Sequence, residues 1–170
     1  MKLQLAEYNF GTLRHGWDDP RSAAFVAGLD LVNGIAETSP GFVWRLTNAD
    51  PGHEGAQPGD LLVEDRKRME GPGFASTLSI WESVADLVHF LGKTVHKQFY
   101  SRKTEWYDAI GNGNMVLWSV PVGHRPTETE GMARWRYHQT HGNTDHAFDW
   151  SHAKDMELAT ADGTVKRNVA

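Results

Sequence analysis

The sequence predicts an α+β domain whose elements follow the order β-α-β-β-α-β, with one more helix and a tail after the last strand. Three observations predict it. The 170-residue length suits one domain with a real hydrophobic core. Short runs of strand-forming residues alternate with longer runs whose apolar residues recur at helical spacing. Cap and turn residues stand at the junctions between these runs.

The first half of the chain is expected to hold two strands and one helix. Leu3 to Phe10 is rich in strand formers. Asp19 followed by Pro20 supplies an N-cap and a first-turn proline for a helix from about Pro20 to Glu37. After the turn residues Ser39-Pro40-Gly41, Phe42 to Thr47 alternates as a half-buried strand does. Residues 48–73 are rich in proline, glycine and charge, and are expected to form a long excursion.

The second half repeats the pattern. Phe74 to Trp81 is the third predicted strand, and Ser83 with Asp86 caps the helix that follows. That helix is expected to bend at Gly92 and to continue to about Tyr107. The remaining elements are a fourth strand, Met115 to Val120 before Pro121, and a last helix from the capping box of Thr127 and Glu130 to about Thr140.

This order predicts a ferredoxin-like unit over residues 1–126, a C-terminal helix and extension over 127–152, and a flexible tail over 153–170. A four-stranded sheet with helices on one side leaves its other face uncovered. Because the chain has seven tryptophans and seven phenylalanines, exposure of that face would be costly. We therefore expect a homodimer, a dimeric α/β barrel, that pairs through the sheet face opposite the helices.

Composition excludes several classes of function. The net charge of −5 argues against nucleic acid as a partner. The absence of cysteine excludes disulfides, zinc-thiolate sites, iron–sulfur clusters and thiol nucleophiles, and fits a reducing cytoplasm. No signal peptide or apolar stretch of about 18 residues is present, so a soluble cytoplasmic protein away from the membrane is expected. Hydrolase, kinase and dinucleotide-binding motifs are also missing.

Several runs resemble a known superfamily. The matching runs in this sequence are Ala6-Glu7-Tyr8-Asn9, Ser39-Pro40-Gly41-Phe42-Val43 and Thr77-Leu78-Ser79-Ile80-Trp81-Glu82-Ser83. They resemble the dimeric α/β-barrel superfamily of antibiotic-biosynthesis monooxygenases and haem-degrading monooxygenases, over about Leu3 to Pro121. Pro40-Gly41-Phe42-Val43-Trp44-Arg45-Leu46, Glu105-Trp106 and Val120-Pro121-Val122-Gly123-His124-Arg125-Pro126-Thr127 are similar to an uncharacterised bacterial branch of it.

The resemblance implies positions for a site. The asparagine that haem-degrading relatives carry late in the first strand falls on Asn9. Their tryptophan on the second helix falls on Phe90, and their histidine on Tyr100, while His96 lies one helical turn earlier. Haem degradation itself would therefore lack two of its three site residues.

The residues themselves offer further candidates, each with an alternative. His96 could act as a base or as a haem ligand, or belong to a solvated helix face. His124 could be catalytic or could fix the turn after the fourth strand. Trp44 and Trp106 could line a substrate pocket or fill the core, and Asn33 could contact substrate or make a structural hydrogen bond. The histidines 138, 141, 146 and 152 lack the carboxylate pattern of a metal site.

We therefore expect a monooxygenase-like oxidoreductase that acts on a hydrophobic, aromatic or polyketide-like small molecule, with no cofactor or with haem. In the cofactor-free mechanism Asn9 would hold an enolate that passes an electron to dioxygen, with His96 as base. With haem, His96 would be the proximal ligand of the iron, and the aromatic cavity would hold the porphyrin. The alternatives are a non-redox cyclase or isomerase that uses the same cavity, and a dimeric small-molecule-binding protein without catalysis.

Overall fold

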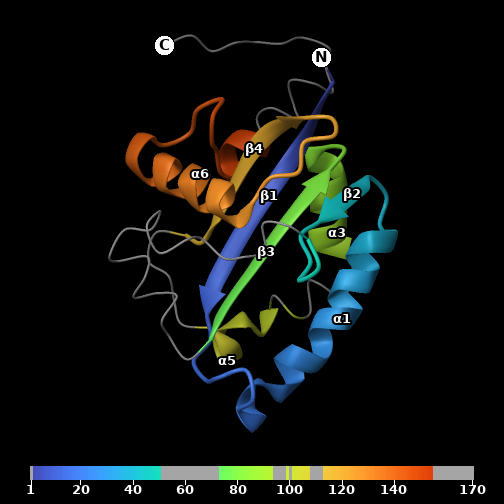
Figure 1. The fold of residues 1–170 in the computed structure, drawn as a ribbon, viewed down its shortest axis with the longest axis vertical. Coiled ribbons are helices and arrows are strands. Elements are labelled where there is room, and N and C mark those ends of the chain that lie inside the picture. The colour runs from blue at the N-terminus through green and yellow to red at the C-terminus, as the bar shows by residue number, and fades with distance from the viewer. Residues whose placement is uncertain (1, 51–72, 94–98, 100, 108–112, 155–170) are drawn as a thin grey trace.

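The structure, a computed structural model, describes residues 2–50, 73–93, 99, 101–107 and 113–154. It is a mixed α+β protein with a four-stranded antiparallel sheet in the order β2-β3-β1-β4 (Figure 1). The strands are β1 (Leu3–Thr12), β2 (Phe42–Arg45), β3 (Phe74–Trp81) and β4 (Met115–Pro121). The helices are η1 (Pro20–Ser22), α1 (Ala23–Thr38), α3 (Val84–Lys93), α5 (Lys103–Trp106) and α6 (Glu128–His141).

The helix starts follow the expected caps. The Asp19 carboxylate accepts a hydrogen bond from the backbone N–H of Arg21 at 2.8 Å, and Pro20 opens the 3₁₀ turn before α1. The Ser83 hydroxyl accepts from the N–H of Asp86 at 3.2 Å before α3. The Thr127 hydroxyl accepts from the N–H of Glu130 at 3.2 Å before α6. Each cap therefore fixes where its helix begins.

The second strand is shorter than predicted, because a turn removes its last residues from the sheet. The backbone N–H of Thr47 and its hydroxyl both donate to Asp50 Oδ2, at 2.8 and 2.6 Å. The Asp50 side chain thus accepts a hydrogen bond from the backbone of a nearby residue, as aspartate side chains commonly do in turns. The strand ends at Arg45, although the Leu46 N–H still donates to the Leu78 carbonyl at 2.9 Å, and residues 51–72 of the predicted excursion lie outside the described residues.

The sheet has two faces, which we name by the helices that cover them. The α6 face carries Ala6, Tyr8 and Phe10 of β1. It buries them with side chains of β3, β4 and α6: Leu78, Ile80, Val116, Trp118, Val120, Met132 and Trp135. The α1/α3 face carries Leu5, Glu7 and Asn9 of β1, and α1 and α3 pack on its side of the sheet (Figure 1).

The sheet face that was expected to stay wet in a monomer is covered within the chain. Tyr8 and Trp118 are fully buried there, and Trp135 of α6 meets Phe10 edge to face at 5.1 Å between ring centroids. The prediction of an exposed aromatic face is wrong, because the helix after β4 folds back over that face. The uncovered face was the reason to expect a homodimer through this surface, and that reason no longer applies.

The segment after α6 crosses the edge of the sheet. The backbones of Phe148 and Leu117 exchange two hydrogen bonds, at 2.8 and 2.9 Å. Beyond this bridge Ala153 is fully buried with Phe148 in the cluster of the α1/α3 face. Ala153 was expected to begin a loose tail, yet it is a packed core residue; residues 155–170 lie outside the described part.

Replacement of Gly41 by alanine is expected to destabilise the fold by about 2 to 3 kcal/mol. Gly41 has φ of 72°, and a Cβ there would overlap the carboxyl of Asp86, which is bonded to Ser83 at the start of α3. Gly113→Ala is the matched control: its φ is 73°, but a Cβ meets nothing within 4 Å. Urea unfolding should show a loss of about 1 kcal/mol for the control. Equal losses would contradict the overlap.

Candidate functional site

Four polar side chains form a row across the two central strands on the α1/α3 face. This polar row consists of Glu7 and Asn9 on β1 with their register partners Ser79 and Thr77 on β3. One apolar cluster surrounds the Glu7 end; its members include Leu5, Trp81, Leu87, Phe90 and Leu117, the β4 partner of Glu7. A second lies beyond the Asn9 end and includes Leu13, Phe25 and Trp106. The polar row thus separates two hydrophobic clusters on one face of the sheet.

Glu7 is a carboxylate with both oxygens engaged inside the protein. Its side chain belongs to a residue only 6% exposed. The Asn9 amide donates to Glu7 Oε1 at 2.6 Å, and the Ser79 hydroxyl donates to Glu7 Oε2 at 3.1 Å. Ser79 in turn accepts a hydrogen bond from the Trp81 indole at 3.0 Å. The carboxylate is therefore held by a chain of neutral donors.

Burial raises the pKa of Glu7 to about 7, against 4.5 for an ordinary glutamate. The hydrogen bonds from Asn9 and Ser79 act in the opposite direction, because they stabilise the charged form. The result is a carboxyl group that changes its protonation state near neutral pH. Such groups are typical of general acids and bases.

The polar row opens toward solvent at its Asn9 end. Glu7 and Ser79 are buried, Asn9 is half-buried, and Thr77 is exposed although it lies on a central strand. Met115, the partner of Asn9 on β4, is also half-buried. The helix layer therefore leaves this part of the sheet accessible, and Asn9 stands between the solvent and Glu7.

A tyrosine ring occupies the next position along the row. Gly11 follows Asn9 on the same face of β1, and any side chain there would overlap the ring of Tyr107. Burial raises the Tyr107 pKa above its usual range, and its hydroxyl makes no hydrogen bond with the described residues. The glycine thus leaves room for the Tyr107 ring at the position that follows Asn9 on this face of the sheet.

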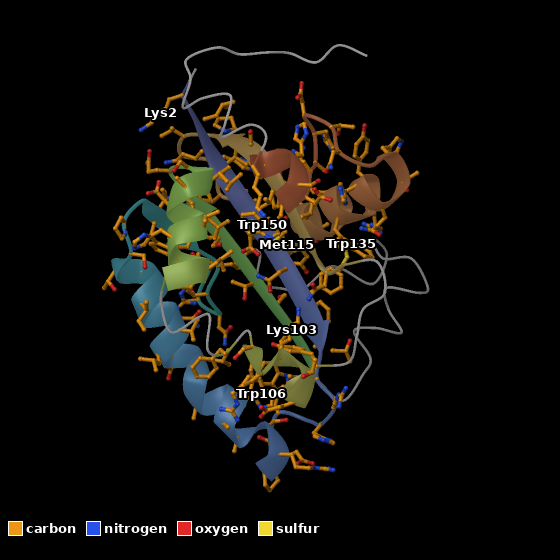
Figure 2. The ribbon with its side chains drawn as sticks, turned by 180° about the vertical axis from the view of Figure 1, so that it is seen from behind. Lys2, Lys103, Trp106, Met115, Trp135 and Trp150 are labelled. Atoms are coloured by element: carbon orange, nitrogen blue, oxygen red, sulfur yellow. The ribbon has the colours of Figure 1, made fainter. Side chains whose placement is uncertain are left out.

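The structure brings some of the predicted site residues to this face. Asn9 lies in the polar row. Phe90 is 7% exposed and stacks on Trp81 at 5.2 Å between centroids. Trp106 is 4% exposed against Phe25, at the end of the molecule below Met115 (Figure 2). These two aromatics lie in the clusters that flank the polar row.

Asn33 is half-buried on α1, at a helix position between members of the two clusters, Leu29 and Ala36. The structural hydrogen bond that the sequence offered as an alternative is not made with any described residue. Its role as a substrate contact stays a prediction. His96 and Tyr100 lie outside the described residues, so their predicted roles are neither supported nor opposed here.

Two predicted site residues lie elsewhere. Trp44 packs in the α6 face, with the Arg125 guanidinium 5.4 Å from its ring centroid. His124 lies after β4, and its Nε2 is 2.8 Å from the carboxylate of Glu130 on α6. Trp44 and His124 therefore do not lie in the polar row with Asn9, because strand alternation places Trp44 on the opposite face and His124 is bonded to Glu130 of α6.

Sequence reasoning missed Glu7 altogether. The signal was present, since Glu7 is a charged residue in the middle of an apolar strand, between Leu5 and Asn9 at period two. A carboxylate on a strand face that the pattern marks as buried needs partners. Ser79 at the paired position could have been found only once the register of β1 and β3 was known.

The described residues hold no group of three or more histidine, cysteine, aspartate or glutamate side chains that could bind a metal ion. In the same part of the chain, no helix combines the length and the apolar composition that crossing a membrane requires.

Comparisons with known proteins place the chain beside proteins without an assigned activity. A family described as "Domain of unknown function (DUF3291)" matches residues 4–163. No curated protein matches. The crystal structure of a protein of unknown function from Nitrosomonas europaea is similar at 11% sequence identity and a TM-score of 0.46, covering 74% of this chain and 97% of that one.

Proposed function

We propose, on the premise that the chain belongs to the family described as domain of unknown function DUF3291, that it is a small-molecule enzyme in which Glu7 removes a proton from a hydrophobic substrate. The substrate class is a hydroxy-aromatic or enolisable compound. The family description carries no activity, so the polar row supports the proposal. The observation that carries it is the buried Glu7 carboxylate, bonded to Asn9 and Ser79 between two hydrophobic clusters.

Each part of the polar row has a chemical use in this proposal. The carboxylate accepts the proton, and the flanking aromatic side chains bind the apolar body of the substrate by excluding water. The Asn9 amide has two N–H bonds and uses one toward Glu7, so the second can bind the oxygen on which negative charge develops. The ring of Tyr107 lies over Gly11, the next position on this face, so its O–H is a second candidate donor.

The reaction that we propose is a cofactor-free oxygenation, as the monooxygenase resemblance implies. Glu7 takes a proton from a CH₂ group of the substrate, and the substrate anion passes one electron to dioxygen. The two radicals join as a peroxide, which takes the proton back from Glu7. Loss of water then leaves a carbonyl, so that one substrate molecule and one O₂ give one ketone and one H₂O.

Two finer statements about the fold belong to the same proposal. The sheet order β2-β3-β1-β4, with α1 between β1 and β2 and α3 between β3 and β4, supports a ferredoxin-like unit. Pairing of two units into a dimeric barrel stays a prediction, which sedimentation of the purified chain tests. Its interface would have to use surface other than the part of the sheet under α6.

The residue predicted to bind haem is His96, which lies outside the described residues. The polar row contains a carboxylate, an amide and two hydroxyl groups, and none of these is an imidazole or a thiolate, the ligands that haem iron prefers. These side chains fit proton transfer better than iron ligation. No step is therefore assigned to haem.

The test is oxygen consumption by the purified protein with anthrone, an enolisable tricyclic aromatic, followed with an oxygen electrode and by product absorbance. The proposal expects one O₂ consumed for each ketone formed. Consumption of anthrone or a related enone without O₂ uptake would move the function to the isomerase alternative. Binding without any turnover would reject the enzyme and leave the small-molecule-binding alternative.

Replacement of Asn9 by alanine is expected to lower turnover of anthrone about 100-fold or more, because it removes a donor from the developing oxyanion. Gln4→Ala is the matched control. Gln4 lies on the same strand, is 5% exposed and donates to a glutamate, Glu82, at 2.8 Å, but it faces the other side of the sheet. The rate constant kcat should fall for Asn9→Ala alone. Equal loss in both variants would assign Asn9 a structural role.

A further inference from the structure

A chain of hydrogen bonds runs from Trp81 through Ser79 to Glu7. We propose that Trp81 is a positioning residue, which holds the Ser79 hydroxyl in its donating direction and thereby sets the protonation equilibrium of Glu7. The inference rests on the proposed function only for the catalytic use of that equilibrium. The three residues are 1%, 5% and 6% exposed, so water does not replace these hydrogen bonds.

The direction of each hydrogen bond follows from the chemistry of its donor. An indole N–H can only donate, so the Ser79 oxygen must accept from Trp81, at 3.0 Å. The Ser79 hydroxyl hydrogen then needs an acceptor in a buried site. Among the described residues, Glu7 Oε2 at 3.1 Å is the acceptor within its reach. Ser79 therefore donates to Glu7, which favours the charged carboxylate.

The indole itself cannot turn away. Its ring stacks on Phe90 at 5.2 Å between centroids, with 24° between the ring planes, and meets Phe42 edge to face at 5.3 Å. Strand pairing fixes the other end, because Glu7 is the register partner of Ser79 and Leu5 that of Trp81. Strand pairing and the packing of Trp81 against Phe90 of α3 thus hold the hydrogen-bond chain in place.

Among the described strand residues and the cluster side chains of α1 and α3, no charge competes with this effect. On the α1/α3 face the described strand residues around Glu7 are uncharged; they are Leu5, Asn9, Thr77, Ser79, Trp81, Met115, Leu117 and Ser119. The side chains of α1 and α3 in the adjacent cluster are apolar: Val32, Ile35, Ala36, Val84, Leu87, Phe90 and Leu91. The described surroundings thus leave burial and the two neutral donors to set the Glu7 equilibrium.

The experiment is Trp81→Phe, which keeps an aromatic ring against Phe90 and removes the N–H. The Ser79 hydroxyl is then free to rotate and to accept a hydrogen bond from neutral Glu7. The pKa of Glu7 is expected to rise by roughly one pH unit. It is read from the carboxyl carbon signal of ¹³C-glutamate-labelled protein, assigned with Glu7→Gln.

Trp118→Phe is the matched control. The Trp118 indole is fully buried and donates to a carboxylate oxygen of Glu130 at 3.1 Å, on the α6 face. Its loss should leave the Glu7 titration where it is. A second variant, Ser79→Ala, removes the donor itself and should also raise the Glu7 pKa, even if Trp81→Phe fails to fold.

An unchanged Glu7 titration in Trp81→Phe, or in Ser79→Ala where Trp81→Phe does not fold, would overturn the inference. A Trp81 with only a structural role would lower stability without moving that titration. A raised Glu7 pKa in a protein that turns over no anthrone keeps the positioning role and rejects the proposed function. Where turnover exists, the acid limb of its pH profile should move with the Glu7 signal.

Discussion

Glu7→Gln is expected to lower anthrone turnover by about 100-fold to 10,000-fold, the usual worth of a positioned general base. Glutamine fills the same space. Its amide oxygen can accept from Ser79, and its amide nitrogen can donate to the side-chain oxygen of Asn9 once the Asn9 amide turns over, so the buried row keeps its hydrogen bonds. What is lost is the ability to take up a proton. The measurement is kcat over pH 5 to 9.

The same variant is expected to be more stable than the natural chain above pH 7. The folded-state pKa of Glu7 is about 7 and the unfolded value is 4.5, so the unfolded chain ionises first as the pH rises. Below pH 4.5 both states are protonated and the burial of Glu7 carries no charge penalty. The penalty grows as pH rises to about 7 and then stays constant, at about 3 kcal/mol.

The free energy of unfolding of Glu7→Gln, relative to the natural chain, should therefore increase between pH 5 and pH 8. Chemical denaturation at both pH values checks this. Glu128→Gln is the matched control, because Glu128 is a second buried carboxylate, 5% exposed, bonded to Tyr8 and Ser76 on the α6 face. The Glu128→Gln variant should retain its turnover of anthrone. A Glu7→Gln protein with full activity, or with no gain in stability at pH 8, would refute the assignment.

Trp135→Ala is expected to cost about 3 to 5 kcal/mol of stability, the range for removal of a large aromatic from a packed core. Trp135 is 5% exposed and contacts Phe10, and it is the largest side chain that α6 contributes to the cluster under it. Figure 2 shows it on the helix that covers this side of the sheet. Its loss should loosen α6 from β1 and β4.

Urea unfolding of Trp135→Ala should be compared with that of Trp17→Ala. Trp17 is also a tryptophan in contact with a phenylalanine, Phe25, but it is 40% exposed. The control should lose about 1 kcal/mol at most. Similar losses for the two variants would mean that α6 does not pack on the sheet in solution. The dimer through that face would then return as the better account.

The strands and caps could be predicted because their causes are local. Asp19, Ser83 and Thr127 each bond a backbone N–H two or three residues away, so the sequence spacing contains the whole interaction. The docking of α6 could not be predicted in this way. α6 covers Tyr8 and Trp118 because of where the chain turns after β4. The pattern of apolar residues within the helix does not predict which face of the sheet it will cover.

In the candidate site, too, local features could be predicted, whereas contacts between residues distant in the sequence could not. Asn9 was predicted from the first strand and its resemblance, and the structure places it in the polar row, while its contact with a substrate stays a prediction. Glu7 was missed because its significance depends on Ser79, which lies 72 residues away and meets it only through strand register. The face on which Trp44 lies could not be predicted either, because the alternation within its strand does not say which set of residues faces which helices, whereas the pairing with Ile80 does.

The bridge between Phe148 and Leu117 also bears on how the protein avoids self-association. An edge strand offers free N–H and C=O groups, to which a strand from another molecule can add. At Leu117 both groups of β4 are already bonded to Phe148, and the helical turn that follows is held by Ala153 in the core. At Leu117 the edge therefore cannot pair with a strand from another molecule for as long as the C-terminal segment stays docked, and release of that segment would expose these two groups to such pairing.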